Sequence, residues 1–432
     1  MRRCLFLNLL LAFVLWAVPA QAEGRFIVRV NGGISIIQAI CAPLGCNVAE
    51  TLDGTIGELF LVTAPDSIAP VVLQVLNTLP VVVDVEPDLI AHVAGSTYTV
   101  PPALSDTTPV NYFGTTVPEG YVHQPATSIV RLAQTQSAFS VAGSGVVAII
   151  DTGVDPNHPA LEGVLVPGYD FTRNQSGEAD ETQDVALSSP PDTDGSPQWT
   201  NSNTAAVLSQ STAAVVDGNP QYGEFGHGTM VAGIVHLVAP EAKIMPLKAF
   251  LANGTGYTSD ILRAIYFAVQ NWANVLNMSF NLAAYSTEVK NALDYATLNR
   301  VVSVAAAGNS GEQTLVYPAA LPNVMGIAST TNTDQLSSFS NYGPQLVWVG
   351  APGEGVVTTY PYGTYAAGWG TSFSTPFVTG TVALMMNLQN WVSSSQTAQA
   401  AAHAQPETPA LGHGRLDTFQ ALQAWRNGLG IP

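Results

Sequence analysis

The chain is short of several features that would assign it to other classes of protein. Of its 432 residues, three are cysteines and 13 are basic against 31 acidic, and the formal net charge is −18. A chain of this charge repels polyanions, so we expect neither nucleic acid nor an anionic membrane surface as a partner. After the amino-terminal residues the sequence has no uninterrupted run of about 18 apolar residues, which argues against a membrane anchor in the rest of the chain.

Three motifs of hydrolytic enzymes are absent or incomplete. Asp151-Thr152-Gly153 occurs once, whereas aspartic-protease chemistry requires a second such aspartate. His227 and His236 lie nine positions apart without a His-Glu-x-x-His pattern, so a zinc peptidase is not supported and His236 is expected to be structural. Ser374 stands where the Gly-x-Ser-x-Gly motif of esterases requires its last glycine, and Asp151 precedes this segment rather than following it.

One segment places a serine beside the start of a predicted buried helix. The segment reads Gly370-Thr371-Ser372-Phe373-Ser374-Thr375-Pro376 and leads into an apolar run. Pro376 suits the first helical position, and Ser374 or Thr375 can cap the helix. Free backbone N–H groups at a helix start stabilise the negative charge that an acyl-transfer transition state develops. Ser372 is therefore a candidate nucleophile, with an ordinary capping serine as the alternative.

Two upstream segments supply the groups that a serine nucleophile needs. Residues 145–150 read as a strand buried on both faces of a parallel sheet, which delivers Asp151 at its carboxyl end. His227 lies between two glycines at the start of a helix of small residues. An imidazole can take the proton of a serine hydroxyl, and a buried carboxylate fixes the tautomer of that imidazole. We therefore expect Asp151, His227 and Ser372 to act together.

These segments resemble the subtilases, the subtilisin-like serine proteases of peptidase S8 type, in which Asp, His and Ser follow one another in this order. The resemblance extends from Asp151 to about Ala424. It implies a three-layer α/β fold with a central parallel sheet. It also implies a serine endopeptidase that acts on polypeptides through Asp151, His227 and Ser372, by way of an acyl-enzyme, without a cofactor or metal in the chemistry.

The resemblance also identifies the groups that would bind the oxyanion. Asn309 lies in residues 301–311, which are similar to the oxyanion strand of the family. Asn309 would then donate from its side chain, and Ser372 from its backbone N–H. An inactive binding protein of the same fold is the alternative, but such a protein normally lacks a member of the triad or the oxyanion asparagine.

The same resemblance implies where a substrate lies. An edge segment would pair with the residues before the scissile bond, adding the substrate as a strand; it consists of Gly254, Thr255 and Gly256. Ser279 and Phe280 resemble one wall of the S1 pocket, which receives the side chain just before the scissile bond. The family commonly continues with glycines after Ser279, whereas Phe280, Asn281 and Leu282 follow here. The sequence therefore predicts a bulkier or differently routed wall.

The amino terminus has the pattern of a signal peptide spanning residues 1–22. Two arginines precede an apolar run from Leu5 to Val18, and Ala20-Gln21-Ala22 provides small residues for cleavage. A membrane anchor is the alternative, but the apolar run is short for a full span. We therefore expect a secreted or periplasmic protein.

Residues 23–94 read as a small α+β unit followed by an extended tail. The predicted strands are Phe26–Val30, Leu59–Thr63 and Pro80–Val85. The predicted helix is Ile68–Leu79. The arrangement resembles the inhibitory propeptide of subtilases, which implies a ferredoxin-like fold, removal by self-cleavage and a tail, Leu89–Ala94, lying along Gly254–Gly256. A permanent amino-terminal domain is the alternative.

Two cysteines, Cys41 and Cys46, lie in this small unit. In an exported protein, a disulfide across the intervening loop and a pair of buried thiols are both compatible with the spacing. The rest of the chain divides into residues 95–144, the predicted amino-terminal segment of the mature protease, and residues 145–427, the predicted catalytic domain. We expect the mature protein to be a monomer.

A polar stretch, residues 172–222, separates Asp151 from His227. One interpretation is a solvated surface insertion. The other is a structural calcium site, because hard cations favour clustered oxygen ligands. The candidate calcium ligands are Asp180, Glu181, Asp184, Asp192 and Asp194.

Overall fold

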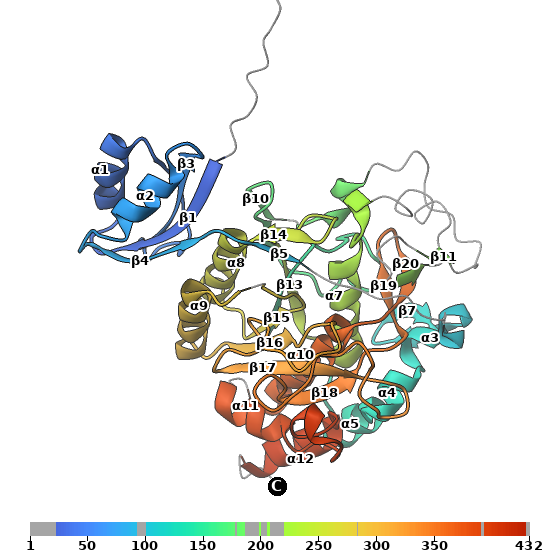
Figure 1. Ribbon diagram of the computed structural model, residues 1–432. Helices are drawn as coiled ribbons and strands as arrows, with labels where there is room; N and C mark the ends of the chain where they lie inside the picture. Colours follow the sequence, from blue (N-terminus) through green and yellow to red (C-terminus); the bar gives the residue numbers. More distant parts are fainter. Residues whose placement is uncertain are drawn as a thin grey trace, which may run out of the picture.

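The computed structural model describes residues 23–92, 101–177, 179–185, 198–199, 205–207, 220–282, 284–389 and 393–428. A small amino-terminal unit lies beside helices α8 and α9 of a larger body, and a short strand, β5, continues from it onto that body (Figure 1). The predicted signal peptide, residues 1–22, lies outside the described residues.

The small unit has the order β-α-β-β-α-β. Its elements are β1 (Glu23–Val30), α1 (Ile34–Leu44), β2 (Asn47–Thr51), β3 (Leu59–Pro65), α2 (Ala69–Leu76) and β4 (Val82–Pro87). The sheet runs β2-β3-β1-β4 with every pair antiparallel, which is the ferredoxin-like arrangement expected from the sequence. Alternate residues of β1, Phe26, Val28 and Val30, are buried with residues of both helices. The strands β1, β3 and β4 and the helix α2 confirm the sequence prediction, whereas α1 and β2 were not predicted.

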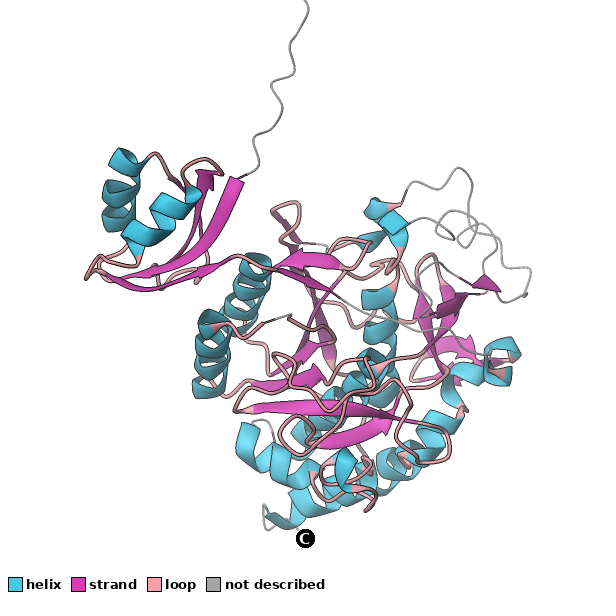
Figure 2. Ribbon diagram, viewed as in Figure 1, coloured by secondary structure: helices cyan, strands magenta, loops and turns pink. Residues whose placement is uncertain are grey.

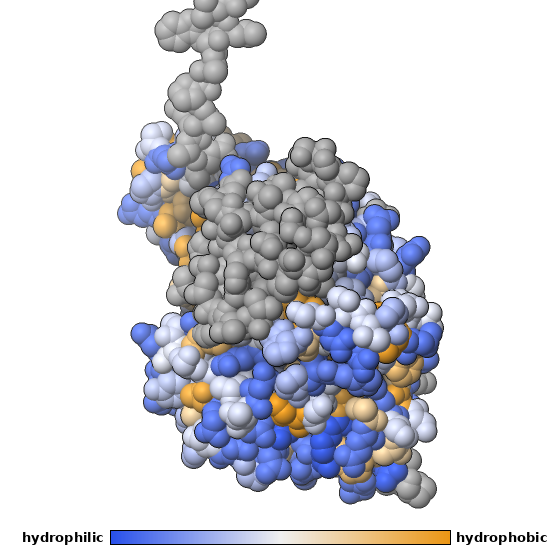
Figure 3. All heavy atoms as spheres, turned by 90° about the vertical axis from the view of Figure 1, so that its right-hand side faces the viewer, coloured by the Kyte–Doolittle hydropathy of each residue, from blue (hydrophilic) through white to orange (hydrophobic). Residues whose placement is uncertain are grey.

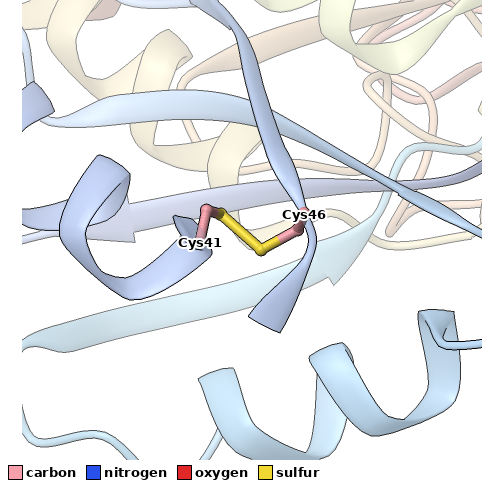
Figure 4. Close-up of a disulfide and its surroundings, with 2 residues drawn as sticks. All are labelled: Cys41 and Cys46. Atoms are coloured by element: carbon pink, nitrogen blue, oxygen red, sulfur yellow. A yellow bond between two sulfur atoms is a disulfide. The ribbon is translucent and has the colours of Figure 1, made fainter. Parts of the chain in front are cut away.

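Cys41 and Cys46 form a disulfide, with 4.7 Å between their Cα atoms. The bond joins the last part of α1 to the chain just before β2 (Figure 4). Gly45 turns the chain between them with a φ of 77°, in the left-handed region that glycine adopts readily. The structure thus favours the disulfide over the pair of thiols.

An eight-stranded sheet forms the middle layer of the large body, in the order β10-β9-β13-β8-β15-β16-β17-β18. Its strands are β8 (Val146–Asp151), β9 (Gly168–Asp170), β10 (Gln175–Gly177), β13 (Lys243–Lys248), β15 (Val275–Met278), β16 (Val302–Ala306), β17 (Val324–Thr330) and β18 (Val349–Pro352). All neighbours are parallel except β9 and β10. The central parallel sheet is therefore confirmed.

Helices cover both faces of this sheet (Figure 2). They include α7 (His227–Val238) and α10 (Thr371–Leu388) on one face, and α8 (Thr258–Gln270) and α9 (Thr287–Leu298) on the other. Val147 and Ile149 of β8 are buried with the first pair, whereas Ala148 and Ile150 are buried with the second pair. Because successive residues of a strand point to opposite faces, β8 is apolar from Val146 to Ile150, up to Asp151 at its end. This arrangement is the predicted three-layer α/β fold.

Helix α10 begins earlier than the sequence predicted. It starts at Thr371, after Gly370, so Ser374 and Thr375 lie inside the helix and do not cap it, and Pro376 is not its first residue. A proline there removes the N–H that would bond to the Ser372 carbonyl. The Ser279 hydroxyl donates to that carbonyl instead, at 2.9 Å. This tertiary hydrogen bond lets the proline lie within the helix, and Ser372 therefore lies in its first turn.

The remaining elements surround this core. Residues 101–144 form the hairpin β6 (Pro109–Tyr112) and β7 (Thr115–Pro118), then α3 (Glu119–Val122), α4 (Pro125–Ile129) and α5 (Leu132–Phe139). The carboxyl-terminal helices are α11 (Ser394–Ala401) and α12 (Thr418–Gly428). On the face seen in Figure 3, hydrophilic residues dominate where described residues show, with small apolar areas between them. Within the ranges given above, no helix is both long and apolar enough to cross a membrane.

The polar stretch 172–222 is not simply a solvated insertion. Within it, β11 (Gln198–Trp199) and β12 (Ala205–Val207) extend a sheet formed by β19 (Val356–Tyr360) and β20 (Thr364–Gly368). Asp180 and Glu181 are buried. The described first part of the stretch thus packs into the body, whereas the interpretation of the rest as a surface insertion stays a prediction, because residues 186–197, 200–204 and 208–219 lie outside the described residues.

Candidate active site

The fold brings Asp151 and His227 into direct contact and places Ser372 nearby. Asp151 ends strand β8, His227 begins helix α7, and Ser372 is the second residue of α10. The three residues are 1%, 2% and 3% exposed. His227 Nδ1 lies 2.7 Å from Asp151 Oδ1, and the His227 ring centroid lies 5.5 Å from that of Phe373, the residue after Ser372.

The environment of His227 favours its charged form. Burial alone lowers the pKa of an imidazole, but the charge of Asp151 and the hydrogen bond to it raise the pKa of His227 to about 9, with smaller contributions from Glu224 and Glu181. The hydrogen bond to Asp151 uses Nδ1, so the neutral ring keeps its basic lone pair on Nε2. His227 Nε2 has no hydrogen-bond partner among the described residues. Nε2 is therefore the atom that could accept a proton.

The Ser372 hydroxyl donates to the carbonyl oxygen of Ser279 at 3.1 Å. The hydroxyl is not hydrogen-bonded to His227 Nε2, which has no partner among the described residues, so its proton must turn away from Ser279 before Nε2 can accept it. The Asn277 side chain donates to the Ser279 hydroxyl at 2.9 Å and so holds Ser279 in place beside Ser372. Ser279, a predicted substrate-binding residue, thus lies against the candidate nucleophile.

Asn309 is held by the first residue of α10. Its Oδ1 accepts from the backbone N–H and the hydroxyl of Thr371, each at 2.9 Å. The opposite end of the amide, Nδ2, carries the donors that an oxyanion requires. A Cβ at Gly370 would lie 3.1 Å from that Nδ2, in tight contact, so glycine leaves room around the donor. This geometry is compatible with the predicted oxyanion role of Asn309.

The predicted substrate edge already holds a strand of this chain. Strand β14 (Thr255–Tyr257) pairs antiparallel with β5 (Ile90–His92), with Gly256 opposite Ala91. The backbone N–H of Thr258 also donates to the Leu89 carbonyl at 2.9 Å. The structure therefore places the described part of the predicted tail along the edge, as expected. Val93 and Ala94 lie outside the described residues.

Gly256 and Phe280 lie close to this added strand and belong to the surface that it packs against. A Cβ at Gly256 would collide with the carbonyl oxygen of Ala249, so the close approach of β14 requires glycine. Phe280 is 1% exposed, its ring centroid lies 5.0 Å from that of Phe250, and it belongs to the same buried cluster as Ala91. Phe280 was predicted to line the S1 pocket. Its side chain packs with Phe250 in the cluster that also contains Ala91, and its role in the S1 pocket stays a prediction.

Glu181 joins the elements that carry Asp151 and His227. Its carboxylate is fully buried and accepts hydrogen bonds from the Thr152 hydroxyl (2.8 Å), the Gly226 N–H (3.0 Å) and the N–H (2.9 Å) and hydroxyl of Thr229. Thr152 follows Asp151 and Gly226 precedes His227. The Glu181 carboxylate therefore holds the residues next to Asp151 and His227 in place. Burial raises the pKa of Glu181 to about 7 despite these donors. Glu181 is a positioning residue that the sequence alone did not reveal.

The other candidate calcium ligands that are described also use donors from the protein. Asp180 accepts from the Thr182 N–H at 2.8 Å, and Asp184 pairs with Arg173 and, at 2.7 Å, with the buried Lys248 Nζ. Across the described ranges, no three His, Cys, Asp or Glu side chains are grouped so that they could hold a metal ion. Asp192 and Asp194 lie outside the described residues. Asp180, Glu181 and Asp184 thus accept hydrogen bonds or pair with cations of the protein, and the interpretation of this stretch as a calcium site stays a prediction.

Comparisons with known proteins give one consistent family. The profile of the Subtilase family (Peptidase_S8) matches residues 143–421. A "Thermophilic serine proteinase" of Bacillus sp. (strain AK1) is 33% identical over 280 residues, which cover 64% of this chain and 61% of that protein. "Thermitase" of Thermoactinomyces vulgaris is 33% identical over 306 residues, which cover 67% of this chain and 93% of that protein.

A solved structure shares the fold over most of the chain. It is fervidolysin from Fervidobacterium pennivorans, described as a keratinolytic enzyme related to subtilisin, with a TM-score of 0.71 and 22% identity. The likeness covers 93% of this chain and 61% of fervidolysin. The chain thus spans about three fifths of fervidolysin and of the strain AK1 proteinase, and nearly all of thermitase.

Proposed function

We propose, because the chain belongs to the subtilase family, that it is an exported serine endopeptidase that hydrolyses peptide bonds in polypeptide substrates. The observation that carries the proposal is the buried hydrogen bond of 2.7 Å between His227 and Asp151, beside Ser372 and Asn309. Acyl transfer to serine requires three things: a base that a carboxylate orients, a nucleophilic hydroxyl, and an amide that donates to the oxyanion.

In the proposed reaction, Ser372 Oγ attacks the substrate carbonyl carbon while its proton passes to His227 Nε2. The negative charge that develops on the carbonyl oxygen is bound by Asn309 Nδ2 and the Ser372 backbone N–H. The C–N bond then breaks as His227 returns the proton to the leaving amine, which leaves an acyl-enzyme on Ser372. Water, activated by His227, hydrolyses this ester and restores the hydroxyl. Asp151 orients the ring and stabilises its charged form throughout.

A fluorophosphonate probe tests this proposal directly, because it reacts with activated serines. We expect the processed protein to digest casein and to carry the label on Ser372, as located by peptide mass spectrometry. Labelling should block caseinolysis in proportion to the fraction of Ser372 modified. A label on a different serine, or unchanged activity after complete labelling of Ser372, would contradict the assignment.

Export is proposed from the amino-terminal sequence. Arg2, Arg3, the apolar run and Ala20-Gln21-Ala22 have the order of a signal peptide. The disulfide Cys41–Cys46 supports this proposal, because disulfides persist mainly in oxidising compartments outside the cytosol. We propose a secreted or periplasmic protein that is a monomer once processed.

Residues 23–94 are proposed to be an inhibitory propeptide that the enzyme removes itself. The proposal is supported by the pairing of β5 with β14, since a strand at that edge competes with a substrate. Side chains of the small unit also bind the body: Arg29 Nη2 lies 2.6 Å from Glu288 Oε2, and Asp88 accepts from the Ser259 N–H and hydroxyl, each at 2.8 Å. These contacts would hold the unit in place after its peptide bond is cut.

The isolated unit, Glu23–Ala94, is expected to inhibit the processed protease. Deletion of Leu89–Ala94 should raise the inhibition constant by on the order of 100-fold or more, because the β5 hydrogen bonds are lost. Circular dichroism should show that the shortened unit still folds. As a matched control, Asp66→Asn changes an exposed acid of the same unit and should inhibit like the unaltered unit. Equal inhibition with and without the tail would instead favour a permanent accessory domain.

A further inference from the structure

Two segments leave the sheet side by side next to Ser372. Strands β15 and β16 are parallel neighbours, with Met278 opposite Ala305. The chain continues from β15 as residues 279–282, and the end of β16, Ala306, leads on to Asn309. The first segment contacts Ser372 through the Ser279 carbonyl, and the second ends at Asn309.

The space between these two segments is where the residue before the scissile bond has to place its side chain. Its carbonyl carbon must lie within reach of Ser372 Oγ, and its carbonyl oxygen must face Asn309. The side chain is attached one bond away from that carbonyl. It therefore enters between residues 279–282 on one side and 306–309 on the other.

Asn281 crosses this space. With its amide nitrogen directed at the two carbonyls, Asn281 donates to Phe280 O at 3.2 Å and to Ala306 O at 3.0 Å, so it links one segment to the other. A Cβ at Gly308 would lie 2.5 Å from the Asn341 amide and 3.1 Å from the Asn281 amide, so glycine makes room for both side chains. Asn281 is only partly buried.

We propose that Asn281 is a specificity-determining residue that restricts the position before the scissile bond to small side chains, alanine or glycine. The inference rests on the proposed peptidase function. A large side chain such as phenylalanine would displace the Asn281 amide from its two carbonyl partners and leave these polar groups buried without hydrogen bonds. The sequence of the tail agrees with this restriction, since a cut after Ala94 would place alanine at the position.

Peptide p-nitroanilides that differ only in the last residue, alanine or phenylalanine, test the proposal. The processed wild-type protein should show kcat/KM about 100-fold higher for the alanine peptide. Asn281→Gly, and to a lesser degree Asn281→Ala, should raise the phenylalanine-to-alanine ratio of kcat/KM by about 10- to 100-fold. Asn299→Gly, the same substitution at an exposed position after α9, serves as the control and should keep the wild-type ratio.

Titration with a fluorophosphonate separates the two possible failures, because it counts active serines independently of peptide choice. If Ser372 is not labelled and neither peptide is hydrolysed, the proposed function itself is contradicted. Labelled enzyme that prefers phenylalanine would overturn the inference about Asn281 alone, and this wild-type measurement requires no variant to fold. An unchanged ratio in both folded Asn281 variants would overturn it equally.

Discussion

Ser372→Ala is expected to accumulate as a full-length, uncut precursor without protease activity. Removal of the nucleophile should lower kcat by on the order of 10⁶-fold, the scale that holds for related subtilisins, because the proton acceptor His227 then has no hydroxyl to activate. The precursor should retain residues 23–94, since the same serine is proposed to cut the chain. Mass spectrometry of the amino terminus, after expression in a host that lacks other secreted proteases, measures both effects.

Ser374→Ala is the matched control for this experiment. It removes a hydroxyl from the same helix, two residues further on, and the Ser374 hydroxyl has no hydrogen-bond partner among the described residues. Ser374→Ala should therefore mature and digest casein like the unaltered chain. If Ser372→Ala were instead processed normally in that host, self-cleavage would be wrong, and if it kept its activity, the nucleophile would be wrong as well.

Asp151→Asn should lower kcat by about 10⁴-fold, because the amide can no longer hold the charged imidazole or fix its tautomer. The pH dependence should change as well. His227 must be neutral to accept a proton, so kcat/KM rises as pH increases through the pKa of His227. With Asp151 that pKa is about 9, whereas without its charge the lowering effect of burial dominates. The rising limb should therefore move to lower pH in Asp151→Asn.

Profiles of kcat/KM from acid to alkaline pH test this expectation. Asp106→Asn changes an exposed acid of the large body and should keep the wild-type profile. If the rising limb of kcat/KM has the same midpoint pH in Asp151→Asn, Asp151 does not raise the pKa of His227. A wild-type optimum in strong acid would point to carboxylate chemistry in place of an imidazole base.

Local sequence patterns were sufficient to predict the strands and the helix that carry the site residues. Strand β8 could be predicted because it is buried on both faces and is therefore apolar up to its last residue, Asp151, which lies at its carboxyl end. The helix that begins at His227 and the strand before Asn309 carry similarly local signals. The tail was expected along Gly254–Gly256 only through the resemblance to subtilases, and β5 pairs with β14 at this edge.

Features that depend on contacts between distant segments could not be predicted in this way. The start of α10 was misplaced because Pro376 is tolerated within the helix through a hydrogen bond from Ser279, a residue of another strand end. The inward direction of Phe280 depends on Phe250, and the bridging role of Asn281 depends on the Ala306 carbonyl. In the sequence, each of these residues looks like an ordinary member of its segment.

The position of Glu181 limits how far the region between the aspartate and the histidine can be shortened. An engineered compact enzyme that lost residues 172–222 would lose this carboxylate, and the donors of Thr152, Gly226 and Thr229 would remain in the interior. Each such orphaned donor costs about 1–3 kcal/mol, which few small domains can spare. Deletions should therefore begin after Val185. Residues up to Val185 are therefore bound to the geometry of the triad through Glu181.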